Sequence, residues 1–431
     1  MVALVKALQV ILALSILIVL HEFGHFTFAK IFGIRVEKFY LFFDIGGKKI
    51  LHFKIGETEY GIGWLPLGGY CKIAGMVDES MDLEQLKREV QPWEFRAHPA
   101  WQRLLVMFGG VLYNFIFAIL AYSCILGIWG EAYIPNDNAQ IYVNDLSYEM
   151  GFRTGDRILS FDDYVPEDFT TLQADLARRG VRKATVLREG DTVELYMDQS
   201  MTARVLDSPL MFDLAIPFVI DSVTALNAGS GLEKGDRIVS FGGREVHFLQ
   251  DSRSVLADFA NSVVDAAVIR DGHRLDIPVQ VDSAGRIGVY MLSPDIRVKK
   301  YNFLSSIPAG FKMTFSLMKG YLQDLKLLAT PSTGAYKSVG SFIAIGQVFP
   351  ASWDWHQFMY ILALLSIMLG VMNLIPIPGL DGGHILFTLY EMATGRKPSD
   401  RFLAVAQMIG LVLIVALMVL AFGNDIGRLV K

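Results

Sequence analysis

The sequence predicts a polytopic α-helical membrane protein with four transmembrane helices and two tandem β-rich domains between the second and third of them. Three observations favour this fold class. Hydrophobic residues make up 52% of the 431 residues, which is above the usual share in soluble globular domains. Four stretches are apolar over about the 20 residues that a helix needs to cross the hydrocarbon core. The segment between the second and third stretches is polar and repeats itself.

The four apolar stretches define the predicted membrane domain. They are Ala7–Ala29, Leu104–Trp129, Phe358–Ile377 and Phe402–Phe422. The first lacks a convincing A-x-A cleavage site, so we interpret it as a permanent span and not as a signal peptide. We expect the spans within residues 1–30, 101–130, 351–395 and 396–431.

Three ionisable residues lie in the first span, where water is scarce. His21 and His25 are four residues apart and share one face of a helix, and Glu22 lies beside the first. An ionisable side chain at bilayer depth costs on the order of 2.5–3.5 kcal/mol, so such residues are candidates for function. The pattern H-E-x-x-H is typical of zinc sites with a glutamate as general base. Two histidines satisfied by backbone carbonyls would not explain the glutamate.

The distribution of Lys and Arg predicts the orientation in the membrane. Eleven such residues lie from Lys30 to Arg103, between the first two spans, whereas only Lys6 precedes the first span. Further basic residues lie at 396–401, before the last span. Because cytoplasmic loops carry an excess of Lys and Arg, we expect these two segments in the cytoplasm and both termini outside.

The polar segment between the second and third spans contains an internal repeat. GFRTGDRILSFDD begins at Gly151 and GLEKGDRIVSFGG begins at Gly231, and VLREG at Val186 recurs as VIRDG at Val268. A period near eighty residues predicts two tandem domains, which we place at residues 131–213 and 214–295. The G-D-R turn has either a functional or a purely structural role in both copies. Residues 296–350 have amphipathic helical character and would lie on the membrane surface, against the third span, or in solution.

A third metal ligand is expected from a distant segment, because catalytic zinc usually has three protein ligands and an open position. The segment from Asn373 to His384, NLIPIPGLDGGH, contains two prolines and three glycines, so a regular helix should break there. Broken backbone at membrane depth is tolerated only where protein or a water-filled cavity surrounds it. Asp381 and His384 are both candidate ligands. A simple exit turn would not explain an aspartate beside an apolar stretch.

H-E-F-G-H in a first span, followed by N-x-x-P-x-P-x-L-D-G in a later one, resembles the site-2 protease family of intramembrane zinc metalloproteases. The two repeats resemble the PDZ domains of its bacterial type. The resemblance implies that zinc (Zn2+) is held by His21, His25 and Asp381 and that Glu22 activates the water. It also implies a role for Asn373 in holding the substrate or its oxyanion.

Two further segments carry the resemblance. GGVLYN in the second span resembles the family's G-x-x-x-N element at Gly110 and Asn114, for which it implies substrate binding. Residues 31–100 include a stretch that lies where the family has a membrane-associated, reentrant β-hairpin beside the active site.

The resemblance also implies partners and a location. The substrates would be single-span membrane proteins, such as an anti-sigma factor already trimmed by a site-1 protease, or signal-peptide remnants. The PDZ domains would bind peptide ligands in the periplasm, and the active site would lie near the cytoplasmic side of the bacterial inner membrane. A membrane scaffold or transporter with a structural metal site is the alternative, but it has no use for Glu22 as a base. The net charge of −5 gives no indication of nucleic-acid binding.

Overall fold

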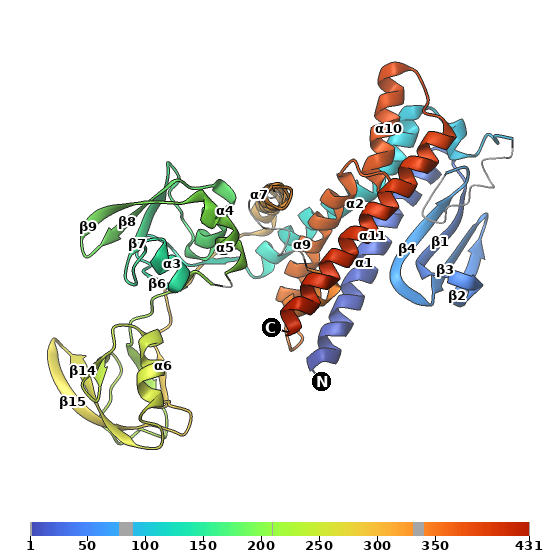
Figure 1. Cartoon of the computed structure of the whole chain (residues 1–431). Helices are drawn as coiled ribbons and strands as arrows, with labels where there is room; N and C mark the ends of the chain where they lie inside the picture. Colours follow the sequence, from blue (N-terminus) through green and yellow to red (C-terminus); the bar gives the residue numbers. More distant parts are fainter. Residues whose placement is uncertain (1, 77–88, 209, 331–339, 431) are drawn as a thin grey trace. The chain divides into compact units, whose positions relative to one another are not determined.

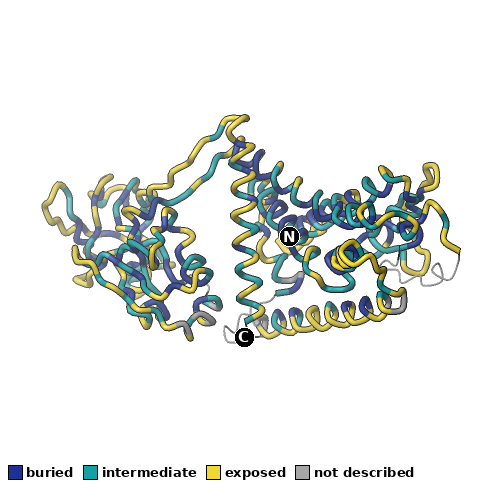
Figure 2. The backbone as a smooth tube through the Cα atoms, turned by 90° about the horizontal axis from the view of Figure 1, so that it is seen from above, coloured by how far each residue is buried: buried dark blue, intermediate teal, exposed yellow. Residues whose placement is uncertain are grey.

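The computed structural model describes residues 2–76, 89–208, 210–330 and 340–430 (Figure 1). These divide into two compact units. The first comprises Met1–Gly130, Lys300–Ala329 and Tyr336–Lys431, and the second comprises Glu131–Lys299 with Thr330–Ala335. Parts of the predicted loop at 31–100 and of the predicted helical region at 296–350 lie outside the described residues, at 77–88 and 331–339. Each unit has its own buried residues, drawn dark blue in Figure 2.

Four helices of the first unit are long and apolar enough to cross a membrane, in agreement with the four predicted spans. They are α1 (Val2–Ile31), α2 (Ala100–Ile128), α9 (Trp355–Leu374) and α11 (Asp400–Val430). Between them the chain also forms α7 (Phe303–Leu328), α8 (Phe342–Val348) and α10 (Asp381–Thr394). The α2 helix packs against α1, α7, α9 and α10 and is therefore the central helix of the unit.

Small residues bring α1 and α2 into backbone contact. A Cβ atom added at Gly24 would lie 2.2 Å from the carbonyl oxygen of Gly109. Small residues are the usual means of close helix approach in membranes, where apolar burial provides little driving force for association. A similar contact joins α7 to α2, because a Cβ at Gly310 would lie 2.3 Å from Ser123 Oγ. The predicted amphipathic helix thus packs against the second span as well as the third.

The expected β-hairpin is larger than predicted. The region forms a four-stranded sheet in the order β2-β3-β1-β4, with β1 parallel to β3 and the other pairs antiparallel. Its strands are β1 (Val36–Phe43), β2 (Lys49–Ile55), β3 (Thr58–Gly63) and β4 (Leu65–Ile73). Only β2 and β3 form a tight hairpin, across a two-residue loop in which Gly56 has a φ of +61°. Because β1 inserts beside β3, the edge strand β4 lies along α1.

The predicted helix break after the third span is present. The α9 helix ends at Leu374 and α10 begins at Asp381. The connecting loop is packed tightly on α11, because a Cβ at Gly410 would overlap the carbonyl oxygen of Pro378. The loop is therefore partly covered by α11, although Pro376 remains exposed.

The second unit contains two successive folds with separate hydrophobic cores, whose buried residues lie within 139–212 and 218–287. The first consists of β6 (Ile141–Val143), α3 (Asp145–Glu149), β7 (Arg157–Phe161), α4 (Leu172–Arg179), β8 (Lys183–Arg188), β9 (Asp191–Tyr196), α5 (Thr202–Asp207) and β10 (Phe212–Leu214). The second consists of β11 (Ile220–Val223), β12 (Arg237–Phe241), β13 (Arg244–Glu245), α6 (Leu249–Ala257), β14 (Val263–Arg270), β15 (His273–Gln280) and β16 (Val289–Met291). A short pair, β5 (Glu131–Tyr133) with β17 (Arg297–Lys299), joins the two ends of the unit.

The repeated motifs form the same ion pair in both folds. The buried carboxylate of Asp156 accepts hydrogen bonds from Arg188 Nε and Nη2, both at 2.8 Å. In the second copy, Asp236 accepts from Arg270 at 2.7 and 2.8 Å. Such bidentate pairs are specific in geometry and strong. The G-D-R turn and the later V-x-R motif are thus two halves of one contact, which favours the structural role for the turn.

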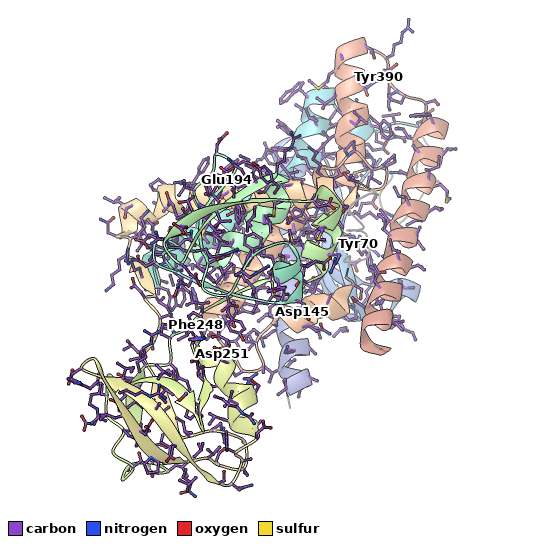
Figure 3. All side chains as sticks on the ribbon, turned by 60° about the vertical axis from the view of Figure 1, so that its left-hand side comes forward. Tyr70, Asp145, Glu194, Phe248, Asp251 and Tyr390 are labelled. Atoms are coloured by element: carbon purple, nitrogen blue, oxygen red, sulfur yellow. The ribbon has the colours of Figure 1, made fainter. Side chains whose placement is uncertain are left out.

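The two folds also touch each other at the start of α6, where Figure 3 labels Phe248 and Asp251. The Asp251 carboxylate accepts from the backbone amide of Phe248 at 2.9 Å, which caps the helix. It also accepts from the Tyr142 hydroxyl of the first fold at 3.0 Å. Asp251 therefore both caps α6 and contacts the first fold.

Candidate metal centre

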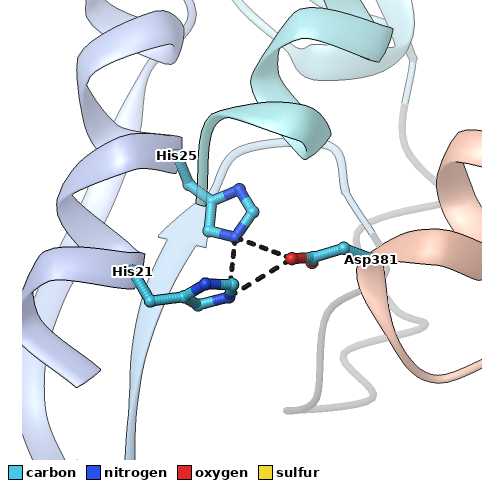
Figure 4. A group of neighbouring side chains, drawn as sticks. All are labelled: His21, His25 and Asp381. Carbon is cyan, nitrogen blue, oxygen red and sulfur yellow. Dashed lines mark hydrogen bonds and ion pairs between the residues drawn. The ribbon is translucent and has the colours of Figure 1, made fainter. Parts of the chain in front are cut away.

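Three side chains from two distant segments meet at the start of α10 (Figure 4). His21 and His25 project from one face of α1, and Asp381 is the first residue of α10. The two Nε2 atoms lie 3.2 Å apart, and Asp381 Oδ2 lies 3.2 Å from that of His21 and 3.3 Å from that of His25. Both histidines are buried. The structure thus brings together the residues expected to bind metal.

The geometry of these three atoms fits a tetrahedral metal ion. Ligand atoms at the usual zinc distances occupy the corners of a tetrahedron with edges of about 3.3 Å. Asp381 Oδ2 is also buried, and among the described residues its neighbours are the two ring nitrogens, neither of which makes a hydrogen bond of good geometry to it. A buried carboxylate oxygen that faces two ring nitrogens in this way is suited to share a cation with them. Among the described residues, these three form the group of His, Cys, Asp and Glu side chains that could hold a metal ion.

One face of α2 supports both imidazoles. His25 Nδ1 lies 2.8 Å from the carbonyl oxygen of Val106, and His21 Nδ1 lies 3.1 Å from the amide of Asn114. Between them, a Cβ at Gly110 would lie 2.5 Å from His25 Nε2 and 2.6 Å from His21 Cε1. The structure therefore places Gly110 and Asn114 against the two histidines that are expected to bind metal, and the expected contact of Gly110 and Asn114 with substrate stays a prediction.

A cavity of about 380 Å³ opens beside the three residues. Glu22 is half-buried on its wall and accepts a hydrogen bond from the backbone of Cys71 on β4. Asn373, near the end of α9, also lines the cavity, with Nδ2 3.2 Å from His21 Nε2. A carboxylate, an amide and the three possible metal ligands thus share one small volume.

His384 lies on the same cavity but outside the group of three. Its Nε2 atom is 3.0 Å from the Gln407 amide nitrogen on α11. The sequence offered Asp381 and His384 as candidates for the third ligand. Of these two, the structure places only Asp381 against both His21 and His25. The contact with Gln407 instead joins α10 to the fourth span.

A buried ion pair holds the far end of α10. Arg103 on α2 donates to Glu391 Oε1 and to the carbonyl oxygen of His98. Both charged side chains are mostly buried. The pair attaches the helix that begins with Asp381 to the helix that supports both imidazoles. In the sequence, Arg103 indicates only the orientation in the membrane, and no local pattern marks Glu391 as its partner.

Comparison with known proteins gives a consistent result over nearly the whole chain. The family model "Peptidase family M50" matches residues 9–417. The regulator of sigma-E protease RseP of Escherichia coli K12 is 30% identical over 451 residues, which cover 97% of this chain and 98% of the relative. RseP of Salmonella typhimurium 14028s is 29% identical over 449 residues, with the same coverage. A Borreliella burgdorferi protein whose name includes the words zinc metalloprotease is 30% identical over 407 residues, or 90% of each chain.

Proposed function

The chain belongs to peptidase family M50, and on this premise we propose that it is a zinc metalloprotease that cleaves membrane proteins within the bilayer. The observation that carries the proposal is the group of three atoms at tetrahedral spacing, which shares a cavity with Glu22. The substrates are single-span membrane proteins, such as an anti-sigma factor trimmed beforehand by a site-1 protease, or signal-peptide remnants. The names of the relatives from Escherichia coli and Salmonella support the connection to sigma-E regulation.

Metal binding, proton transfer and substrate binding are assigned to different residues. His21, His25 and Asp381 hold the metal. When bound, zinc supplies a water of pKa ~7 and polarises the scissile carbonyl. Glu22, fixed by the backbone of Cys71, accepts the proton of the attacking water and passes it to the leaving amine. The Asn373 amide holds the substrate carbonyl.

An extended substrate can reach this cavity along the sheet. A substrate helix must unwind first, because its backbone groups are already paired with each other. The strand β4 is the edge of its sheet and contributes Tyr70 and Cys71 to the cavity wall. An unwound segment would add to this edge by strand pairing, which leaves its peptide bonds beside Glu22.

The two folds of the second unit act as PDZ-like domains that select substrates before cleavage. A groove of about 1020 Å³ in the second fold is lined by Leu249 and Leu256 of α6 and by β16. At the corresponding helix of the first fold, the Gln173 amide binds the backbone oxygens of Val205 and Ser208, and Val205 belongs to the core. The chain's own α5 thus covers this helix. We therefore assign peptide binding to the second fold.

The proposed orientation places the two PDZ-like domains in the periplasm and the metal centre near the cytoplasmic face of the bacterial inner membrane. The support is the excess of Lys and Arg from Lys30 to Arg103. The alternative of a scaffold or transporter with a structural metal site is not favoured. Structural zinc sites usually have four protein ligands, whereas three are grouped among the described residues, beside a carboxylate suited to act as a base.

Co-expression of the full-length chain with candidate single-span proteins tests the proposal. The wild type should cleave a substrate, and Glu22→Gln should keep its zinc but cleave about 10²–10⁴-fold more slowly, because it lacks the base. Glu57→Gln, which changes an exposed glutamate of the sheet region, is the matched control and should cleave normally. Cleavage by Glu22→Gln at the wild-type rate would refute the mechanism.

A further inference from the structure

Asn114 on α2 has an amide group that is fully buried and only half satisfied. Its relative exposure is 0%. Its Nδ2 atom lies 3.1 Å from His21 Nδ1, whereas its Oδ1 atom has no hydrogen-bond partner among the described residues. The amide nitrogen and oxygen have nearly the same shape, so the orientation of the group must be inferred from its hydrogen bonds.

The chemistry of His21 decides between the two orientations. Its Nε2 atom faces Asp381 and His25, so this nitrogen needs a free lone pair to bind a metal. A neutral imidazole carries one proton, and that proton then resides on Nδ1. The Nδ1–H group therefore needs an acceptor. It would find one if the Asn114 amide were turned so that its oxygen faces the ring.

The Nδ1–H group of His25 also needs an acceptor, and here the structure already provides one. Its Nδ1 atom lies 2.8 Å from the carbonyl oxygen of Val106, which can only accept a hydrogen bond. The proton of His25 is thus held on Nδ1, and its Nε2 atom is free for the metal. Ligating histidines commonly donate their other N–H in this way, which fixes both tautomer and ring orientation.

We propose that Asn114 is a positioning residue whose amide oxygen accepts the Nδ1–H of His21 and so keeps the Nε2 lone pair directed at the metal. Val106, Gly110 and Asn114 recur every four residues on one face of α2, and this face sets the orientation of both imidazoles. The Asn114 backbone is itself fixed, because its carbonyl oxygen accepts from Ser366 Oγ of α9 at 2.9 Å. The inference rests on the metal site of the proposed function, but not on the reaction.

The test is the zinc affinity of the full-length protein in detergent, measured by competition with a chelator. Asn114→Leu has a similar size but no acceptor, and it should bind zinc about 10–100-fold more weakly than the wild type. Asn114→Asp keeps an acceptor and has no donor, so it should retain the wild-type affinity. Ser123→Ala removes a hydrogen bond elsewhere on α2, from Ser123 Oγ to the carbonyl oxygen of Ile119 at 2.7 Å, and it is the matched control that should bind zinc like the wild type.

Two results would overturn the proposal. The first is wild-type zinc affinity in Asn114→Leu. The second is a loss of affinity in Asn114→Asp, because the orientation with Nδ2 toward His21 requires a donor that aspartate lacks. This second result also decides the matter if the leucine variant does not fold. A wild type that binds zinc but cleaves no substrate would refute the proposed function and leave this inference standing.

Discussion

A methyl group at Gly110 would occupy space that the two histidines of the proposed metal centre need. In Gly110→Ala the added Cβ would lie 2.5 Å from His25 Nε2 and 2.6 Å from His21 Cε1. Ordinary contacts begin near 3.4 Å, so the methyl group and the rings would have to separate by about 0.9 Å. The backbone of α2 cannot yield easily, because Gly109 already touches Gly24.

The rings must therefore move, and their movement costs metal affinity. Overpacking of a tight core typically costs about 1–3 kcal/mol. If the protein relieves this strain by displacing the imidazoles, the zinc affinity should fall by roughly 5- to 150-fold. Cleavage should fall at least as far when zinc is limiting, and excess zinc should restore part of it.

Chelator competition on the purified variant measures the zinc affinity directly. Gly127→Ala is the matched control on the same helix, because its Cβ would meet Ser306 Oγ at 3.3 Å and only a small shift is needed. This control should bind zinc like the wild type. If Gly110→Ala binds zinc with unchanged affinity, the two imidazoles are not confined by α2, and the supporting role of this helix face is wrong.

Three further predictions concern the third ligand, the orientation and the repeated ion pair. Asp381→Asn should lose zinc and activity while His384→Ala keeps its zinc, and the opposite pattern of zinc content would show that the ligand is misassigned. In a background without the native cysteines, Ser283→Cys should react with a membrane-impermeant thiol reagent in intact spheroplasts, and Ser399→Cys should react only after lysis. Labelling of Ser399→Cys before lysis would show that the orientation is the reverse of the predicted one. Asp236→Asn should destabilise the second fold by about 1.5–3 kcal/mol, as hydrogen exchange of the full chain would show. Hydrogen bonds from the arginine partner lower the pKa of this aspartate, so its stabilisation is present at neutral pH and lost as the pH falls through that lowered pKa; unchanged protection in the variant would contradict this.

Local patterns in the sequence predicted the parts of the site that lie on one element. The spacing of His21 and His25 places both on one face of a helix, and the prolines after Asn373 predicted the break before Asp381. The choice between Asp381 and His384 could not be made from the residues alone, because it depends on how α10 docks beside α1. The sheet was predicted too small, since the parallel pairing of β1 with β3 has no signature in the order of the strands.

Contacts between distant segments were not predictable for a different reason. The Val106 carbonyl binds His25 through its backbone, so the identity of the side chain carries no information. Arg103 and Glu391 are separated by 288 positions, and each resembles an ordinary charged residue at a helix end. The residues of the ion pair belong to motifs that recur in both repeats. The recurrence showed that the two repeats are related, but not that the two motifs within each repeat are in contact.

The distance along the chain between the proposed metal ligands has a consequence for biogenesis. His25 enters the membrane with the first span, but Asp381 follows it by 356 residues. At ribosomal speeds, roughly 20–70 s of synthesis separate the two. Until the last part of the chain has emerged, the first helix carries His21, Glu22 and His25 without the carboxylate of Asp381, the proposed third ligand. On the proposed assignment of the metal ligands, a nascent chain would be inert toward the other membrane proteins inserted around it and would acquire its activity only when its own assembly is almost finished.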